Sequence, residues 1–292
     1  MTPPPKFAEV YAELIGGKLS TATIRRVFDA IFAGAWTPAQ IAGFVSALRA
    51  IGESPEVIGA AAAALRGAMI RVDHGLPRVL DTCGTGGDGL GTLNLSTGAA
   101  IIVAAAGIPV AKHGNRAVSS STGSADVLEA LGVPIDLPAS DAAFVLREAG
   151  IVFLLAPTHH PAMRHAAQAR RELGIRTIFN CLGPLANPAG ASHQLVGAPD
   201  DVLRPSLAAT LRTLGSEGAW VVRGVDGLDE VSPSDVTKVS VVARSGITEL
   251  EIAPEDFGLE RIPLSNIRGG KASENAATLA HQYVLWQARS VV

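Results

Sequence analysis

Cysteine is scarce in this chain. The two cysteines, Cys83 and Cys181, lie far apart in the sequence and lack the short spacing of a metal-binding pair. Two cysteines also cannot build the disulfide framework of a small secreted domain. The segment from Met1 to Lys6 shows no charged leader followed by an apolar run, so we expect no secretory signal. These features together predict a cytoplasmic protein.

A basic excess is absent as well. Lys and Arg number 24 against 27 Asp and Glu, which gives a formal net charge of −3, whereas a nucleic-acid-binding protein usually carries a basic excess or stripe. Aromatic residues make up only 4% of the chain and leave few rings for stacking on bases. No stretch reaches the roughly 18 consecutive apolar residues of a membrane-spanning helix. We therefore expect neither a nucleic-acid partner nor a membrane partner.

Apolar residues at helical spacing dominate the first part of the chain. Hydrophobic residues make up 48% of the sequence, enough for a sizeable core. Ile24, Val27 and Phe28 illustrate the helical spacing. Thr37-Pro38 and Ser54-Pro55 each place a capping hydroxyl before a proline that suits the first helical position. The pattern predicts a four-helix unit.

Beyond His74-Gly75, short aliphatic runs alternate with helical stretches, which is typical of crossover units on a mainly parallel sheet. Pro161–Glu172 is expected to form a further helix. The aliphatic runs are Val79-Leu80, Ile101–Ala106, Val110-Ala111, Val127–Leu131, Ile151–Leu155, Leu195-Val196, Ala219–Val222, Val239–Val242 and Leu250–Ile252.

The predicted fold class is therefore α/β, with a small all-helical domain and a larger α/β domain that contains a central, mainly parallel sheet. We expect the helical domain to span residues 1–72, with a second contribution from about 162–186. Residues 73–161 and 187–292 are expected to form the α/β domain.

A glycine-rich turn, Asp81–Gly89, follows the first short strand, and Asn94–Thr97 then leads into an alanine-rich helix. Glycines allow a close approach of the backbone, and a helix start with hydroxyl groups can bind a phosphate. The glycine spacing fits neither a dinucleotide fingerprint nor a P-loop. A simple tight turn is the alternative interpretation.

Two more polar clusters follow predicted strands. Lys112–Arg116 comes after Pro109–Ala111, at the kind of strand end where ligands gather, and its residue types suit a phosphorylated sugar. Asp226–Glu230 comes after Trp220–Arg223, and magnesium commonly pairs one or two carboxylates with substrate phosphates. For each cluster a solvated polar loop is the alternative.

Together these segments resemble the anthranilate phosphoribosyltransferases, a family of tryptophan biosynthesis. The resemblance runs in order from the N-terminal helices to about Asn275, and the ordered set is more specific than any single motif. The similar segments are Gly84–Asp88, Asn94–Thr97, Lys112–Arg116, Gly123–Asp126, His160–Met163, Arg170–Gly174, Asn180–Leu185 and Asp226–Glu230.

The resemblance implies transfer of the phosphoribosyl group from phosphoribosyl pyrophosphate to anthranilate, in a cleft between the two domains of a homodimer that pairs through its helical domains. The residues implied at the phosphoribosyl pyrophosphate site are Gly84, Gly87, Asp88, Thr92, Asn94, Ser96, Thr97, Lys112, Ser120 and Ser124. Those implied at the anthranilate site are Gly84, His113, Asn115, Arg170, Gly183 and Pro184, the last two in a Gly183-Pro184 turn. Two magnesium ions would be held by Ser96, Asp229 and Glu230.

The implied chemistry assigns no certain catalytic base. His113 is the candidate proton acceptor, and a positioning or structural role is its alternative. The Arg170 guanidinium suits the anthranilate carboxylate because it can donate two parallel hydrogen bonds. Its alternative is a surface helix charge beside Arg171.

The sequence departs from the family pattern in two places. Ser121-Thr122 stands where the family usually has a basic residue followed by serine, so we expect weaker phosphate binding. Family members continue past Glu274–Ala276 with further helices, whereas this sequence ends at Val292. We therefore expect a shortened α/β domain with uncovered apolar sheet surface and lower stability.

Two rival interpretations stay open at this point. A pyrimidine nucleoside phosphorylase would share the fold, but its basic-His-Ser-Thr-Gly-Gly motif is absent from the sequence. A catalytically impaired or nucleic-acid-binding homologue would be expected to have a damaged metal pair or a basic surface. Here Asp229 and Glu230 are both present.

Overall fold

The computed structural model describes residues 3–86, 88–117 and 122–290. Its N-terminal part consists of α1 (Phe7–Ile15), α2 (Thr21–Phe32), α3 (Pro38–Ile51) and α4 (Pro55–Ala68), which confirms the predicted four-helix unit. Ser20, Thr37 and Ser54 cap the last three of these helices, each accepting a backbone N–H of the first turn. Thr37 also completes a capping box with Gln40.

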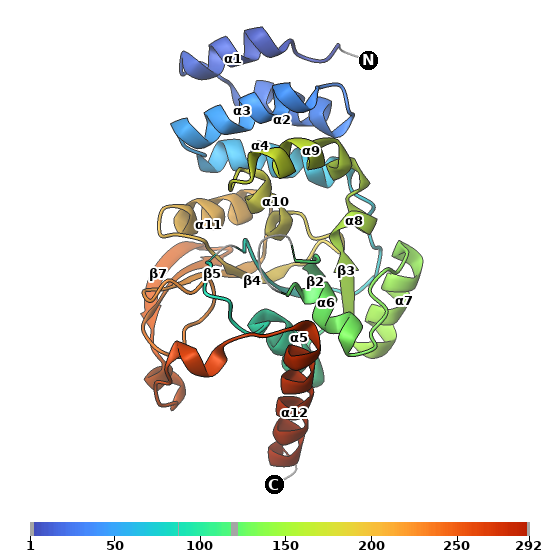
Figure 1. Ribbon diagram of the computed structural model, residues 1–292, viewed down its shortest axis with the longest axis vertical. Coiled ribbons are helices and arrows are strands. Elements are labelled where there is room, and N and C mark those ends of the chain that lie inside the picture. Colours follow the sequence, from blue (N-terminus) through green and yellow to red (C-terminus); the bar gives the residue numbers. More distant parts are fainter. Residues whose placement is uncertain (1–2, 87, 118–121, 291–292) are drawn as a thin grey trace.

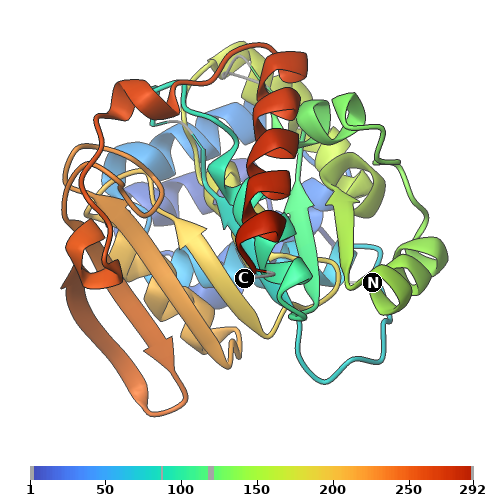
Figure 2. The same ribbon diagram turned by 90° about the horizontal axis from the view of Figure 1, so that it is seen from below.

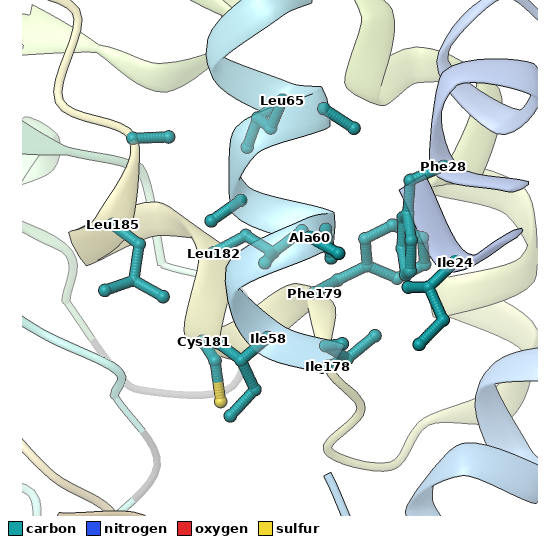
Figure 3. Close-up of a cluster of buried hydrophobic side chains, with 14 of the residues drawn as sticks. Ile24, Phe28, Ile58, Ala60, Leu65, Ile178, Phe179, Cys181, Leu182 and Leu185 are labelled. Carbon is teal, nitrogen blue, oxygen red and sulfur yellow. The ribbon is translucent and has the colours of Figure 1, made fainter. Parts of the chain in front are cut away.

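A segment from the middle of the chain joins this helical layer. α9 (Arg164–Leu173) contacts α2 and α3, and α10 (Phe179–Leu185) contacts α4 (Figure 1). Figure 3 shows Phe179 and Leu182 of α10 beside Phe28, Ile58 and Leu65 of the N-terminal helices. The Phe28 and Phe179 rings meet edge to face, with their centroids 5.9 Å apart. The exact domain boundaries stay a prediction.

The centre of the molecule is a seven-stranded sheet within the described residues, in the order β3-β2-β1-β4-β5-β6-β7. The five strands from β3 to β5 are parallel, and β6 and β7 add to the edge in antiparallel fashion. The mainly parallel sheet was therefore predicted correctly. The strands are β1 (Leu80–Gly84), β2 (Val110–Gly114), β3 (Ile151–Leu155), β4 (His193–Gly197), β5 (Gly218–Gly224), β6 (Thr237–Ala243) and β7 (Gly246–Ile252).

Helices pack against both faces of the sheet. α11 (Leu203–Thr213) lies between α4 and strands β5 and β6, and α7 (Ala139–Ala149) packs on β3. On the opposite side from the helical layer, α5 (Leu95–Ala105) packs on β1 and β2 (Figure 1). α12 (Ala272–Ser290) contacts α5 and α6 (Ser124–Ala130), and Figure 2 shows it in front of the sheet with the N-terminal helices behind. Short helical turns lie at α8 (Ala156–His159), Pro161–Met163, Pro254–Phe257 and Leu264–Ile267.

Two of the aliphatic runs expected in the alternating pattern are not strands. Ile101–Ala106 belongs to α5 and its C-cap, and Val127–Leu131 belongs to α6 and its C-cap. A short apolar run has no periodicity that separates a buried strand from a buried helix. Asn94 and Gly123, which precede these runs, are the N-cap residues of the two helices.

None of the helices within the described ranges combines the length and the apolar character needed to cross a membrane.

Candidate active site

The acidic turn and the glycine-rich turn meet at the carboxyl ends of neighbouring strands. Gly84 ends β1 and pairs with Gly197 of β4, which in turn pairs with Val222 of β5. Asp229 crosses this edge so closely that a side chain at Gly197 would lie 1.7 Å from its carbonyl oxygen. A side chain at Gly84 would lie 3.3 Å from its carboxylate oxygen Oδ2. Both glycines therefore make room for the acidic turn.

Three carboxyl groups gather where the turns meet. Burial and the charge of Asp88 raise the pKa of Asp229 to about 7. Burial and the charge of Asp229 raise the pKa of Glu230 to about 8, although the nearby Lys112 opposes this shift. The backbone amides of Gly86 and Ser96 favour the charged forms of Asp229 and Glu230, respectively, and so oppose the rise of the two pKa values. The carboxylates thus crowd together beside the amides of the glycine-rich turn and of α5.

Lys112 is the buried cation of this site. Its Nζ donates to Ser96 Oγ over 3.1 Å and to the Thr82 carbonyl over 2.5 Å. Burial lowers the pKa of the Lys112 ammonium, and the charge of Asp81 opposes that shift. Asp81 is itself buried and accepts the backbone N–H of His113 over 3.0 Å. Asp81 therefore fixes the segment of β2 that carries both Lys112 and His113.

The first turn of α5 faces the same region. Asn94 is the N-cap residue, and Ser96 and Thr97 lie in the first turn, where the helix dipole favours an anion. Ser124 starts α6 and donates to the Asn115 carbonyl over 3.3 Å. The predicted residues Gly87 and Ser120, like Ser121, lie outside the described residues.

A cavity of about 410 Å³ adjoins this edge of the sheet. It lies between the α/β part and helices α9 and α10 of the helical layer. All six residues that were predicted for anthranilate line it, namely Gly84, His113, Asn115, Arg170, Gly183 and Pro184. Gly84 also touches Asp229, so the cavity wall is continuous with the acidic turn.

His113 presents one ring nitrogen to the wall of this cavity. Its Nδ1 lies 3.0 Å from the Gly183 carbonyl, which fixes Nδ1 as the donor. Its Nε2 has no partner in the part of the chain that the structure describes and is left as an acceptor. Burial and the neighbouring His160 lower the pKa of His113 to about 3. His113 is therefore neutral at physiological pH and a weak proton acceptor.

Arg170 projects from α9 into the cavity lining. Its guanidinium carbon lies 5.8 Å from the centre of the Phe179 ring, within the range of a cation–π contact. Burial lowers the pKa of Arg170. Arg171 beside it is exposed and does not line the cavity. The structure thus disfavours the alternative that Arg170 is a surface charge.

Three local predictions need correction. The strands reach further than expected: Asp81–Gly84 lies within β1, and Lys112–Gly114 lies within β2. Polar residues do not end these strands, because Asp81 and Lys112 are buried and hydrogen-bonded there. The Gly183-Pro184 segment is not a turn but part of α10.

The donor set near the acidic turn fits magnesium that arrives with a diphosphate. Asp229 and Glu230 supply hard oxygen ligands, and a divalent cation would relieve the repulsion that raises the pKa of both. No group of three or more His, Cys, Asp or Glu among residues 3–86, 88–117 and 122–290 is arranged to hold a metal by itself. Phosphate oxygens and water would therefore complete the coordination.

Comparison with known proteins places the chain in a family. Residues 76–289 match the family model described as the a/b domain of a glycosyl transferase family, and residues 14–69 match its helical bundle domain. The chain is 51% identical over 261 residues to the anthranilate phosphoribosyltransferase of Rhizobium meliloti, covering 89% of this chain and 77% of that protein. The chain belongs to the anthranilate phosphoribosyltransferase family.

Other family members show the same similarity in sequence and in structure. The Moorella thermoacetica anthranilate phosphoribosyltransferase is 50% identical, over 92% of this chain and 80% of its own length. The Thermus thermophilus crystal structure superposes with a TM-score of 0.87 at 43% identity, over 92% of this chain and 80% of that one. The structure of the Saccharomyces cerevisiae enzyme in complex with phosphoribosyl pyrophosphate and Mg superposes with a TM-score of 0.87 at 30% identity. The match covers 94% of this chain and 80% of that one.

Several residues of the candidate site were not among those predicted from the sequence. His160, Met163, Arg164 and Asn180 also line the cavity, and Asp81 supports β2. His160 and Met163 stand in a segment that was noted only for its likeness to the family. Their signal was a polar run directly after the buried strand β3, the position at which ligand-binding residues gather.

Proposed function

We propose that this chain transfers the phosphoribosyl group of phosphoribosyl pyrophosphate to the amine of anthranilate, giving N-(5-phosphoribosyl)anthranilate and pyrophosphate, in tryptophan biosynthesis. The observation that carries the proposal is the cavity in which all six expected anthranilate residues meet. Its wall adjoins an acidic turn that faces a glycine-rich turn. Membership of the family supports the same reaction.

The diphosphate end of the ribose substrate would lie between these turns. The residues proposed to bind it are Gly84, Gly87, Asp88, Thr92, Asn94, Ser96, Thr97, Lys112, Ser120 and Ser124. We propose two magnesium ions, held by Ser96, Asp229 and Glu230, which would neutralise the charge that develops on the leaving pyrophosphate. A structure of the Saccharomyces cerevisiae enzyme contains phosphoribosyl pyrophosphate and Mg, which supports the metal but not the count.

The residues of the cavity would orient the acceptor amine. Arg170 would pair with the anthranilate carboxylate. Asn115 would contact the edge of anthranilate that carries the carboxylate and the amine. The amine nitrogen forms a bond to the anomeric carbon while the bond from that carbon to pyrophosphate breaks, and the nitrogen then loses one proton to water or to the released pyrophosphate. The low pKa of His113 favours a positioning role, in which Nε2 accepts a hydrogen bond from the amine without holding its proton.

We further propose a cytoplasmic homodimer that pairs through the helical layer. The two cysteines are free and buried, which suits a reducing compartment. Tyr11 and Ile15 of α1 and Ile51 of α3 are large apolar side chains that stay exposed on the helical layer. A partner surface that covers them would remove apolar area from water.

A turnover assay tests the proposed reaction. Purified protein with phosphoribosyl pyrophosphate, Mg²⁺ and anthranilate should consume the fluorescence of anthranilate and release pyrophosphate. Glu230→Gln keeps the size of the side chain but loses its charge, so activity should fall at least about a hundredfold and require more Mg²⁺. An active protein whose Glu230→Gln variant keeps wild-type kinetics would contradict the metal assignment.

The two rival functions are less well supported. A nucleoside phosphorylase should release a base when it is given a nucleoside and inorganic phosphate, and its phosphate motif is missing from this sequence. A catalytically impaired homologue should bind phosphoribosyl pyrophosphate without turnover. The intact pair Asp229 and Glu230 argues against that reading.

A further inference from the structure

The start of α12 reaches the first turn of α5 through a closed set of hydrogen bonds. The Gly270 N–H donates to Asn275 Oδ1 over 2.7 Å, and Asn275 Nδ2 donates to Asn94 Oδ1 over 3.0 Å. Asn94 Nδ2 donates to the Thr122 carbonyl over 3.3 Å. The Thr122 hydroxyl returns to the Gly270 carbonyl over 2.8 Å. We call Gly270, Asn275, Asn94 and Thr122 the amide ring.

The backbone groups of the ring fix the orientation of both side-chain amides. The Gly270 N–H can only donate, so the Asn275 oxygen must face it and the Asn275 amino group must face Asn94. Asn94 then turns its oxygen to Asn275 and its amino group to the Thr122 carbonyl, which can only accept. Among the residues that the structure describes, the second N–H of the Asn94 amino group has no partner.

The amide ring is partly buried and rests on close backbone contacts. Asn275 is 2% exposed and Thr122 is 8% exposed, whereas Asn94 and Gly270 are half-buried, so the protein partly shields these bonds from water. The Leu93 N–H donates to the Ile267 carbonyl, and the Gly269 N–H donates to the Gly91 carbonyl, both over 2.8 Å. A side chain at Gly269 would lie 2.5 Å from the Thr92 carbonyl oxygen. Residues 267–275 therefore form a wall along residues 91–94.

We propose that Asn275 is a positioning residue for the phosphoribosyl pyrophosphate site, acting through the Asn94 amide at the head of α5. This inference rests on the proposed function, because Asn94 and Thr92 are two of the residues proposed to bind that substrate. Asn275 does not line the cavity that is proposed for anthranilate. Its effect should therefore fall on one substrate and spare the other.

Two substitutions open the ring from opposite sides. Asn275→Ala removes the donor to Asn94, and Thr122→Val removes the hydroxyl but keeps the shape of the side chain. Each should raise the KM for phosphoribosyl pyrophosphate about tenfold, as expected for a lost buried hydrogen bond, and should leave the KM for anthranilate within about twofold. The double variant should be little worse than either single one, because one ring has been opened twice.

Two matched controls separate positioning from general loss of structure. Thr122→Ser keeps the hydroxyl and should therefore have the wild-type KM for phosphoribosyl pyrophosphate. Ser273→Ala changes an exposed residue on the same turn of α12 and should have no effect. Equal loss for both substrates, or a lower melting temperature with an unchanged KM for phosphoribosyl pyrophosphate, would overturn the proposal.

Hydrogen–deuterium exchange of the ligand-free protein tests the amide ring by a measurement that does not depend on enzyme activity. Asn275→Ala and Thr122→Val should exchange faster than wild type over residues 91–98, whereas α2 and α4 should not change. If the wild type shows no transfer at all, the proposed function fails and this measurement alone decides the role of the ring. Unchanged exchange over residues 91–98 in both variants would then overturn it.

Discussion

Two adjacent arginines on α9 have different surroundings. Arg170 lines the cavity and lies over Phe179, whereas Arg171 is exposed. Their side chains are chemically identical, so the pair isolates the effect of position from that of charge. A helix turns about 100° per residue, and neighbours therefore point in different directions.

Arg170→Ala should act mainly through anthranilate. Removing a guanidinium that pairs with a carboxylate should raise the KM for anthranilate by about 10- to 100-fold and that for phosphoribosyl pyrophosphate by less than about twofold. Arg171→Ala should leave both constants near wild type. Steady-state kinetics with each substrate varied in turn measures the difference. A selective effect of Arg170→Ala on the ribose substrate would refute the assigned role.

The histidine pair beside the cavity predicts loss of stability in acid. Burial and the charge of His159 lower the pKa of His160 to about 4, and burial and His160 lower that of His113 to about 3. As the pH falls, these histidines take up protons near pH 6.5 in the unfolded chain but only at a lower pH in the folded chain. The free energy of unfolding should therefore fall as the pH drops from about 6.5 towards 4.

Replacing one histidine of this pair should weaken the pH dependence. Urea unfolding at pH 7 and pH 5 should show a smaller difference for His160→Gln than for wild type. His281→Gln changes an exposed histidine and serves as the control. An unchanged difference for His160→Gln would show that His160 does not stay neutral in the folded protein.

At the scale of elements, the connection from β5 to β6 holds the acidic turn in shape. The Asp226 carboxylate accepts the hydroxyl groups of Ser232 and Ser234 and the backbone N–H of Leu228. The Gly224 N–H donates to the Leu228 carbonyl over 2.8 Å. Asp226 thus organises the backbone that carries Asp229 and Glu230 without facing the glycine-rich turn itself.

Asp226→Ala should lower the affinity for magnesium in the presence of phosphoribosyl pyrophosphate. Loss of these hydrogen bonds frees the turn, and we expect the Mg²⁺ concentration for half-maximal activity to rise about tenfold. Asp235→Ala removes a more exposed carboxylate of the same connection and should have little effect. A magnesium titration of activity would measure both. Equal behaviour of the two variants would contradict the role of Asp226.

Local signals explain which elements could be predicted. Thr37 and Ser54 cap helices by bonds within four residues, so the sequence alone located these two helix starts. The apolar runs Ile101–Ala106 and Val127–Leu131 follow helix starts without a side-chain cap of this kind, and each run is too short for its periodicity to separate a strand from a helix.

Contacts between distant segments explain what could not be predicted. Asn275 and Asn94 are 181 residues apart, and nothing in either neighbourhood indicates that they touch. Asp81 and Lys112 were expected beyond the strand ends. A buried polar residue within a strand is favourable only with a hydrogen-bond partner, and the sequence does not reveal that partner. The anthranilate set could be named from the family resemblance, but its convergence on one cavity required the fold.

At the scale of the whole molecule, the sheet carries exposed apolar side chains away from the helical layer. Trp220 of β5 is 37% exposed and Leu250 of β7 is 38% exposed. α12 packs on α5 and α6. The lower stability expected from the sequence stays a prediction, which a thermal melt compared with that of the Thermus thermophilus or Moorella thermoacetica protein would test.

The proposed homodimer makes the last prediction. Ile15 of α1 is 58% exposed on the helical layer, and Phe144 of α7 is equally exposed on the α/β part. Light scattering should give twice the 30.0 kDa mass of one chain for wild type. Ile15→Asp places a charge where the partner would bury an apolar side chain, so this variant should shift towards the single-chain mass at micromolar concentration. Phe144→Asp makes the same kind of change outside the helical layer and should stay dimeric.

Because a C₂ interface buries the same patch twice, one substitution acts on both protomers and should have a strong effect. A wild-type protein with the mass of one chain would contradict the dimer, and dissociation by Phe144→Asp alone would move the interface to the α/β part.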